Sequence, residues 1–336
     1  MAMIGRIAVL FAALGAMFSV NAASRDTKSA SLRPEIEAFV EAFSDKHGVP
    51  AAELRLILRH ARVQQSILRA MSVQSTARPW HRYRPIYVNP DRIAGGVRFW
   101  DRHADLLARA EREYGVPAEL IVATIGVETI YGGFTGTHRV LDALTTLAFD
   151  FPRRAEFFRG ELEQFLLLAR DGVVDPLRLK GSYAGAMGIP QFMPSSFQRY
   201  AVDFDGDGRR TLWDGVADSI GSVANYYRTF GWQTGEPVVL SANVEGTGYL
   251  DLAEKGIEPT ITAAEFKTAG VSSTEDLGER GAAMLVLEDD TGPLYLLGLK
   301  NFYVITRYNR STNYALSVHR LAQEIRAARE AAGLKP

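Results

Sequence analysis

One carboxylate inside an apolar run constrains the fold of this sequence more than any other feature. The stretch ELIVATIGVETIYGG, residues 119–133, places Glu128 among aliphatic side chains. Pro117 can begin a helix at its first position, where its missing N–H is not needed, and Gly132 can end it. We therefore expect a helix from Pro117 to Gly132 that carries a carboxylate against apolar neighbours.

The position of Glu128 on this helix predicts an unusual pKa. Ile121, Ile125 and Glu128 lie at i, i+4 and i+7, so the carboxylate shares a face with two isoleucines that we expect to be buried. Burial disfavours the ionised form and the helix C-terminus adds partial negative charge, so both effects raise the pKa. Such a protonated acid suits glycosidic cleavage; a solvated or structurally paired glutamate is the alternative.

The composition of the chain is that of an ordinary globular protein, and its N-terminus predicts export. The 336 residues are 47% hydrophobic and 23% charged, and the net charge of −1 gives no basis for nucleic-acid binding. Residues 1–22 combine Arg6, an apolar run and small residues suited to cleavage, which is typical of a signal peptide. The chain contains no cysteine, so we expect no lipid anchor, no disulfide and a soluble periplasmic protein.

Hydrophobic periodicity predicts a mainly α chain with one β-rich segment. Helical patterns fill 32–108 and 109–234, and a last long helix at 312–334 is expected to complete the first of these domains. Short β-type runs at 235–301 predict a small antiparallel subdomain, from which 302–311 returns to the core with a strand-like pattern. Within the first domain, WHRYRPIYVNP (80–90) carries two prolines and predicts a loop.

The stretch DFDGDGRRTLWD, residues 203–214, has the pattern of a calcium-binding loop. Carboxylates fall at positions 1, 3, 5 and 12 of twelve, glycine stands at position 6, and position 7 offers its carbonyl. The predicted ligands are Asp203, Asp205, Asp207, the Arg209 carbonyl and Asp214. Because Asp replaces Glu at position 12, we expect a structural Ca²⁺ of moderate affinity; a solvated acidic turn is the alternative.

A third stretch, GSYAGAMGIPQFMPSSF (181–197), suits close approach to a ligand. Its small residues let the backbone come near, and Ser182 and Gln191 offer neutral hydrogen-bonding groups for sugar hydroxyls and acetamides. Tight packing of helices would use the same small residues, and both interpretations stay open at this point.

These motifs, with SIGSVANYY and NFYVITRYNRSTNYA, closely resemble the lytic murein transglycosylase B family from about Leu32 to the C-terminal helix. The resemblance implies a lysozyme-like helical core with an EF-hand-type loop, a flanking helical domain and a small β domain. It also implies cleavage of the β-1,4 bond between N-acetylmuramic acid and N-acetylglucosamine in peptidoglycan, leaving a 1,6-anhydro sugar. Since the chain has no cysteine to be lipidated, it resembles the soluble branch.

The resemblance further implies roles for individual residues. Glu128 matches the family's catalytic glutamate, which acts first as acid and then as base. The implied glycan contacts are Tyr83, Ser182, Gln191, Tyr308, Asn309 and Tyr314. Peptidoglycan glycan strands are the implied partner, and proteins of cell-wall synthesis are further candidates.

Two other functions remain open on the sequence. A hydrolytic muramidase would use the same acid with a positioned water, and a peptidoglycan-binding protein would keep the groove without turnover. We expect Asp142, Asp150 and Asp175 to be caps or loop residues rather than a second catalytic carboxylate, because none stands in an apolar setting.

Overall fold

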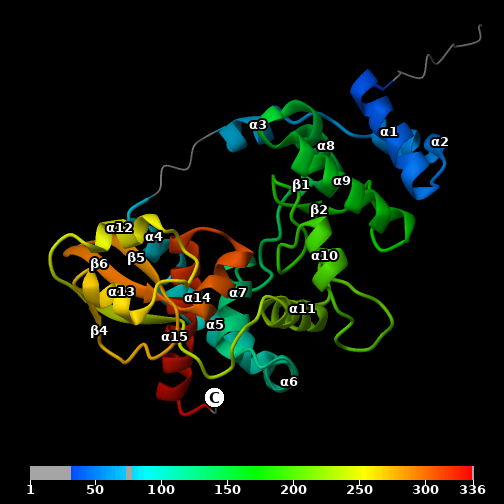
Figure 1. Cartoon of the computed structure of the whole chain (residues 1–336). Coiled ribbons are helices and arrows are strands. Elements are labelled where there is room, and N and C mark those ends of the chain that lie inside the picture. Colours follow the sequence, from blue (N-terminus) through cyan, green and yellow to red (C-terminus); the bar gives the residue numbers. More distant parts are fainter. Residues whose placement is uncertain (1–31, 73–77, 335–336) are drawn as a thin grey trace, which may run out of the picture.

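Helices dominate the computed structural model, which describes residues 32–72 and 78–334 (Figure 1). This confirms the mainly α fold; the predicted signal peptide, 1–22, lies outside the described residues. None of the helices in the described ranges is long and apolar enough to cross a lipid bilayer. The helices are α1 (Pro34–His47), α2 (Ala51–Leu58), α3 (Gln65–Ser72), α4 (Trp80–Tyr87), α5 (Pro90–Arg102), α6 (Ala104–Tyr114), α7 (Ala118–Thr129), α8 (Val140–Asp150), α9 (Ala155–Arg170), α10 (Pro194–Tyr200), α11 (Val216–Thr229), α12 (Tyr249–Glu254), α13 (Ala263–Thr268), α14 (Lys300–Tyr308) and α15 (Thr312–Ala331).

The predicted glutamate helix is α7, and it forms the centre of the core. Every residue from Leu120 to Val127 is buried, as expected for a helix that is apolar on all sides. It packs against α15 on one side and against α5, α6 and α11 on others. Pro117 lies just before the first helical residue rather than at it, with an extended backbone.

The segment 32–108 divides its contacts between two parts of the molecule. Arg33 donates to Asp150 at the end of α8 (2.7 Å), and Lys46 donates to Glu163 of α9 (2.8 Å), so α1 lies against α8 and α9. In contrast, α4 and α5 pack against α15 (Figure 1). The expected association of α15 with this segment therefore involves its second half, and the domain boundaries remain a prediction.

The β subdomain contains a four-stranded antiparallel sheet in the order β4-β3-β6-β5. Its strands are β3 (Val239–Val244), β4 (Val271–Ser273), β5 (Ala283–Asp289) and β6 (Gly292–Gly298). The three β-type runs noted in the sequence are β3, β5 and β6, whereas β4, α12 and α13 carried no clear signal. A second apolar core, around Leu240, Phe266 and Leu297, lies beneath the sheet.

Two expectations about local structure were wrong. The predicted loop at 80–90 contains the helix α4, with Pro85 inside it and Trp80 buried at its start. The strand-like return segment, 302–311, lies largely in the helix α14, where Phe302, Val304 and Ile305 are buried. In both places the apolar side chains pack against α15, and this tertiary contact outweighs the local preference.

Candidate active site

Glu128 lies in the last turn of α7, where its side chain is only partly exposed. The hydroxyl of Tyr314, near the start of α15, donates a hydrogen bond of 2.5 Å to its Oε1. Tyr314 is itself buried and stacks on Tyr308, with ring centroids 6.5 Å apart. Two helices that are far apart in the sequence therefore meet at this carboxylate.

The pKa of Glu128 is raised to about 7. Burial is the cause, and the hydrogen bond from Tyr314 opposes it because a donated proton stabilises the ionised form. The carboxyl group is therefore close to half-protonated at neutral pH, in agreement with the expectation from Ile121 and Ile125.

Tyrosines surround this carboxylate. Burial raises the pKa values of Tyr308 and Tyr314 well above the ordinary value, and the charge of Glu128 raises them further. The same charge acts on Tyr83 of α4 and on Tyr227 of α11. Of the predicted glycan contacts, Tyr83, Tyr308 and Tyr314 therefore lie within the electrostatic influence of Glu128, as does Tyr227.

Tyr226 and Tyr227 are site residues that the sequence analysis did not single out. The Tyr227 hydroxyl bonds to Thr124 on α7 at 2.8 Å, and the Tyr226 hydroxyl donates to the carbonyl of Arg307 at 2.6 Å. The motif SIGSVANYY, which carries the family resemblance, ends in these two tyrosines and could have indicated them. They lie on α11, which packs against α7.

The chain leaves α7 through two residues in the left-handed region, Ile130 (φ 54°) and Tyr131 (φ 61°). A β-branched residue there is strained. The Tyr131 hydroxyl donates to the Arg92 carbonyl at 2.6 Å, and a Cβ at Gly126 or Gly95 would lie within 2.6 or 2.7 Å of its ring. This close packing holds the backbone immediately after Glu128 in place.

The small-residue stretch forms a loop beside the end of α7. Its entry is fixed by the two-stranded pairing of β1 (His138–Arg139) with β2 (Lys180–Gly181). The Ser182 hydroxyl accepts from the N–H groups of Ala184 and Ala186 at 3.3 and 3.0 Å, which leaves its own proton free to donate. Ser182 therefore shapes the turn of this loop.

Gln191 lies in the same loop with a left-handed backbone, φ 51°. Its amide nitrogen donates to the carbonyls of Thr135 (3.0 Å) and Gly188 (2.8 Å), so only the side-chain oxygen remains for a ligand. The adjacent Pro190 carbonyl accepts from the Tyr308 hydroxyl at 2.6 Å, which ties this loop to the tyrosines around Glu128.

The remaining predicted residues have other hydrogen-bond or ion-pair partners. Asn309 is exposed, and its side-chain oxygen accepts from the Ser311 N–H at 3.1 Å. Asp175 accepts from the Leu177 N–H, as expected of a loop residue, whereas Asp150 ends α8 and pairs with Arg33. Asp142 differs from the expectation, because it is buried in α8; its partners there include the Arg139 guanidinium at 2.5 Å.

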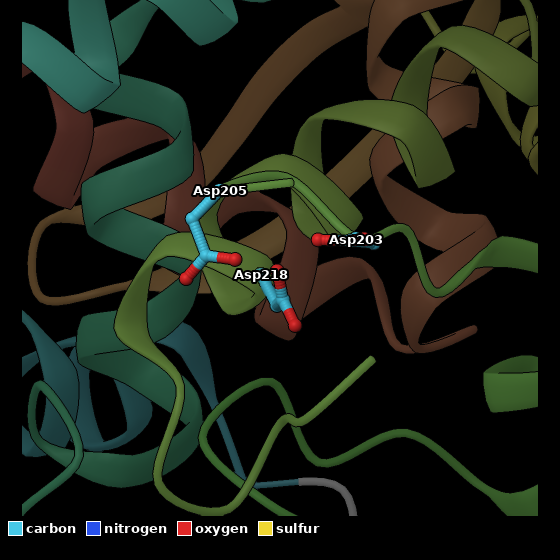
Figure 2. Close-up of side chains that lie close together, drawn as sticks. All are labelled: Asp203, Asp205 and Asp218. Atoms are coloured by element: carbon cyan, nitrogen blue, oxygen red, sulfur yellow. The ribbon is translucent and has the colours of Figure 1, made fainter. Parts of the chain in front are cut away.

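The predicted metal loop brings three carboxylates together, as Figure 2 shows: Asp203 and Asp205 from the loop and Asp218 from the first turn of α11. One oxygen of each lies within 4.8 Å of the others. Asp218 is buried, and its two oxygens accept from the N–H groups of Phe204 and Thr211, each at 2.7 Å. Several convergent carboxylate oxygens are a ligand set that suits Ca²⁺.

Asp218 takes the place in this cluster that the sequence pattern gave to Asp214. Within the described ranges, the cluster of convergent acids includes neither Asp207 nor Asp214. The Asp207 carboxylate accepts from the Arg209 N–H at 2.8 Å, and Asp214 is hydrogen-bonded to the Thr211 hydroxyl. Gly208, with φ 85°, makes the sharp turn that the pattern predicts.

The metal loop is in direct contact with the loop beside Glu128. The Ile189 N–H donates to the Leu212 carbonyl at 2.6 Å, and the Ile189 carbonyl accepts from the Thr129 hydroxyl at 2.8 Å. A Cβ at Gly188 would lie 2.3 Å from the Leu212 oxygen. The loop that carries the carboxylate cluster therefore packs against Gly188 and Ile189, which lie beside the end of α7.

Comparison with known proteins agrees with this geometry. Residues 31–323 match the sequence model of the transglycosylase SLT domain. The chain is 47% identical over 307 residues to membrane-bound lytic murein transglycosylase B of Escherichia coli K12, covering 88% of this chain and 84% of that protein. The soluble lytic transglycosylase SltB1 of Pseudomonas aeruginosa is similar in structure, with a TM-score of 0.84, 50% identity, and 88% and 100% of the two chains covered.

Two further solved relatives contain ligands. Slt35 of Escherichia coli was solved with calcium; its TM-score is 0.80 at 47% identity, with 88% of this chain and 94% of that chain covered. SltB3 of Pseudomonas aeruginosa was solved with NAG-NAM-pentapeptide; its TM-score is 0.75 at 31% identity, with 86% and 79% covered. The chain therefore belongs to the transglycosylase SLT domain family, as a peptidoglycan-cleaving enzyme of the lytic murein transglycosylase B type.

Proposed function

We propose that this enzyme cleaves the β-1,4 bond between N-acetylmuramic acid and N-acetylglucosamine with Glu128 as the only catalytic carboxylate. Protonated Glu128 donates its proton to the glycosidic oxygen as the bond to C1 breaks, and the 2-acetamido oxygen of the muramic acid bonds to C1 in its place. The Glu128 carboxylate then accepts the proton of the C6 hydroxyl while O6 displaces the acetamide oxygen. The product end is 1,6-anhydromuramic acid.

The observation that carries this proposal is the partly buried carboxyl of Glu128, with a pKa of about 7 and one hydroxyl donor, Tyr314. A pKa near the working pH lets one group give and take a proton with similar ease. One carboxyl group with this pKa can therefore serve both steps, and the proposed mechanism needs no second carboxylate.

We assign the glycan contacts to the residues around this carboxyl. Tyr308 and Tyr314 are stacked aromatic rings, and Tyr83 lies on α4, where the charge of Glu128 contributes to its raised pKa. Ser182 keeps a hydroxyl proton to donate, and Gln191 keeps an oxygen to accept from a sugar hydroxyl or acetamide N–H. The exposed Asn309 would serve the outer part of the groove.

The anhydro product requires that the C6 hydroxyl reach C1 before water does. That hydroxyl is tethered in the same sugar ring, which gives it a large effective concentration. The tyrosine side chains around Glu128 reduce the space for a positioned water. A hydrolytic muramidase would need such a water, and a non-catalytic binding protein would not need the raised pKa of Glu128.

We further propose that the loop 203–214 binds a structural Ca²⁺ through Asp203, Asp205 and Asp218, with the Arg209 carbonyl as an additional ligand. The cluster of carboxylates and the calcium complex of Slt35 support this assignment. When bound, the ion would neutralise acids that otherwise repel one another; ligand roles for Asp207 and Asp214 remain predictions.

The proposed setting is the periplasm, reached by the signal peptide 1–22, with peptidoglycan glycan strands as substrate. The complex of SltB3 with NAG-NAM-pentapeptide supports a glycan that carries stem peptides. Proteins of cell-wall synthesis remain proposed partners.

The test is a digestion of purified sacculi by the wild type and by Glu128→Gln, with the soluble products identified by mass spectrometry. The wild type is expected to release muropeptides that end in 1,6-anhydromuramic acid, and the variant to bind sacculi without releasing them. Full activity of the variant would contradict the role of Glu128. Binding without any release by the wild type would favour the non-catalytic alternative.

A further inference from the structure

Among the strands in the described ranges, none pairs with the outer edge of β5, which lies near the candidate active site. β5 is the last strand in the order β4-β3-β6-β5. A cleft of about 470 Å³ runs along it, and its lining includes the five consecutive residues 284–288. Side chains of consecutive strand residues point to opposite faces, so a cavity that touches all five runs along the backbone edge.

The pairing of β5 with β6 shows which backbone groups point into this edge. Glu288 pairs with Pro293, which has no N–H, so this is a pair without ladder hydrogen bonds, and the N–H and C=O of Glu288 point away from β6. Because these pairs alternate along the strand, the backbone N–H and C=O groups of Val286 and Met284 also point away from β6. Ala282 confirms the direction, because it exchanges both backbone hydrogen bonds with Ile261 on this outer side, at 3.0 Å each.

Most of this edge is available for a ligand. Along residues 284–288, one outward group has a contact among the described residues: the Glu288 carbonyl, 3.4 Å from the Nδ1 of His81. The outward groups of Met284 and Val286 have no such partner, and the Val286 side chain is 41% exposed. Four residue steps from Met284 to Glu288 span about 14 Å, which matches an extended peptide of four or five residues.

Two helices connect residues that line the cleft to residues that interact with Glu128. Ser311, Thr312 and Asn313 line it at the start of α15, and the next residue, Tyr314, donates to Glu128. Trp80 lines it at the start of α4. One turn later, the charge of Glu128 contributes to the raised pKa of Tyr83. Residues of the lining are therefore one position, or one helical turn of about 5.4 Å, from residues that interact with Glu128.

The lining of the cleft carries one exposed charge of each sign, Arg78 and Glu288, and Arg78 can hold a carboxylate of a peptide. Arg78 is exposed in the lining, and the Asn313 side chain holds its carbonyl in place at 2.8 Å. The N-terminus of α15, with its positive end of the helix dipole, opens toward the same place. A peptide carboxylate near Arg78 would be stabilised by both.

We infer that the β5 edge, from Met284 to Glu288, binds the stem peptide of the muramic acid by strand addition, with backbone hydrogen bonds to Val286 and a carboxylate near Arg78. This assignment rests on the proposed function, because it takes the sugar at Glu128 to be peptide-bearing. It extends that function from the glycan alone to the peptide that the glycan carries. Strand addition gives affinity through the main chain and is tolerant of side-chain identity.

Val286→Pro tests this directly, because proline removes an outward N–H and leaves the β5–β6 ladder intact. Val286→Thr is the matched control, with the N–H and the branched shape retained. Both are made in the Glu128→Gln background, so that strands stay whole, and binding is measured for glycan strands with stems and for the same strands after the stems are removed. Far-UV circular dichroism and the Tm check that each variant is folded.

We expect Val286→Pro to bind stem-bearing strands about two- to tenfold more weakly, which is the loss of one hydrogen bond, and stem-free strands as before. Val286→Thr should match the parent on both. If Val286→Pro is misfolded, Arg78→Glu replaces it, with the same selective loss expected.

Three results would overturn the inference. The first is equal affinity of the parent for stem-bearing and stem-free strands. The second is an unchanged ratio of these two affinities in Val286→Pro. The third is a loss of affinity for stem-bearing strands in Val286→Thr as large as that in Val286→Pro. Turnover is measured separately with Glu128 present, so a failure of the proposed function appears as missing anhydro products whatever the binding ratio.

Discussion

The raised pKa of Glu128 predicts that this carboxyl group destabilises the folded protein at neutral pH. The ordinary carboxyl pKa of 4.5 becomes about 7 on folding. Because the folded state binds the proton more tightly, the contribution of Glu128 to stability is highest below about pH 4.5, falls as the pH rises to about 7, and stays constant above that. At full burial this difference corresponds to about 3 kcal/mol, and partial exposure reduces it to about 2 kcal/mol.

Glu128→Gln removes the charge and keeps an oxygen that can accept from Tyr314. The variant should therefore be more stable than the wild type by about 2 kcal/mol at pH 8 and equal to it at pH 4. Urea unfolding, followed by circular dichroism at both pH values, gives the two free energies of unfolding. A variant that is folded but no more stable than the wild type at pH 8 would refute the burial of this carboxyl.

Glu163→Gln is the matched control, because its pKa is shifted in the opposite direction. Burial raises the pKa of Glu163, but hydrogen bonds and charge from Lys46 and His47 outweigh burial and lower it. Its stabilising contribution is present above the ordinary pKa and is lost as the pH falls through the lowered value. This variant should therefore lose stability at pH 8, whereas Glu128→Gln gains it.

Three further substitutions probe the parts around Glu128. Tyr314→Phe removes the donor that lowers the pKa of Glu128, so the alkaline limb of the kcat/KM pH profile should move up by about one pH unit, and an unmoved limb would contradict the hydrogen bond. Asp205→Asn should abolish most of the rise in Tm that calcium gives the wild type, and should change the Tm measured in chelator only a little. An equal rise in Tm with calcium in the wild type and the variant would exclude the proposed ion site. Tyr131→Phe loses the hydrogen bond to the Arg92 carbonyl, so unfolding should cost about 1 kcal/mol less and kcat should fall severalfold, whereas unchanged values in urea unfolding and turnover assays would show that the hydroxyl has no positioning role.

The sequence was sufficient for those parts of the site that depend on local pattern. The helix around Glu128 follows from its apolar run, and three of the four strands in the main sheet follow from short β-type runs. In the loop 203–214 the spacing of the acids anticipates that Asp203 and Asp205 converge, and Gly208 adopts the predicted turn. In each case the decisive side chains lie within a dozen residues of one another.

Contacts between distant segments account for what could not be predicted. The twelve-residue pattern ends at Asp214, but α11 begins at Val216 and brings Asp218 back against the loop. Pro85 argues against a helix locally, yet α4 forms because Trp80 is buried there and the helix packs against α15. The meeting of Tyr314 with Glu128 joins residues 186 positions apart, which no local spacing reveals.

The central claim is that O6 of the muramic acid, and not water, displaces the acetamide oxygen from C1 after Glu128 has protonated the glycosidic leaving group. Digestion of sacculi in water enriched with oxygen-18, followed by mass spectrometry of the new glycan ends, tests this most directly. The account predicts anhydro ends that carry no oxygen-18 and lack one water relative to reducing ends. New reducing ends that each carry one oxygen-18 would show that water attacks C1, and would contradict it.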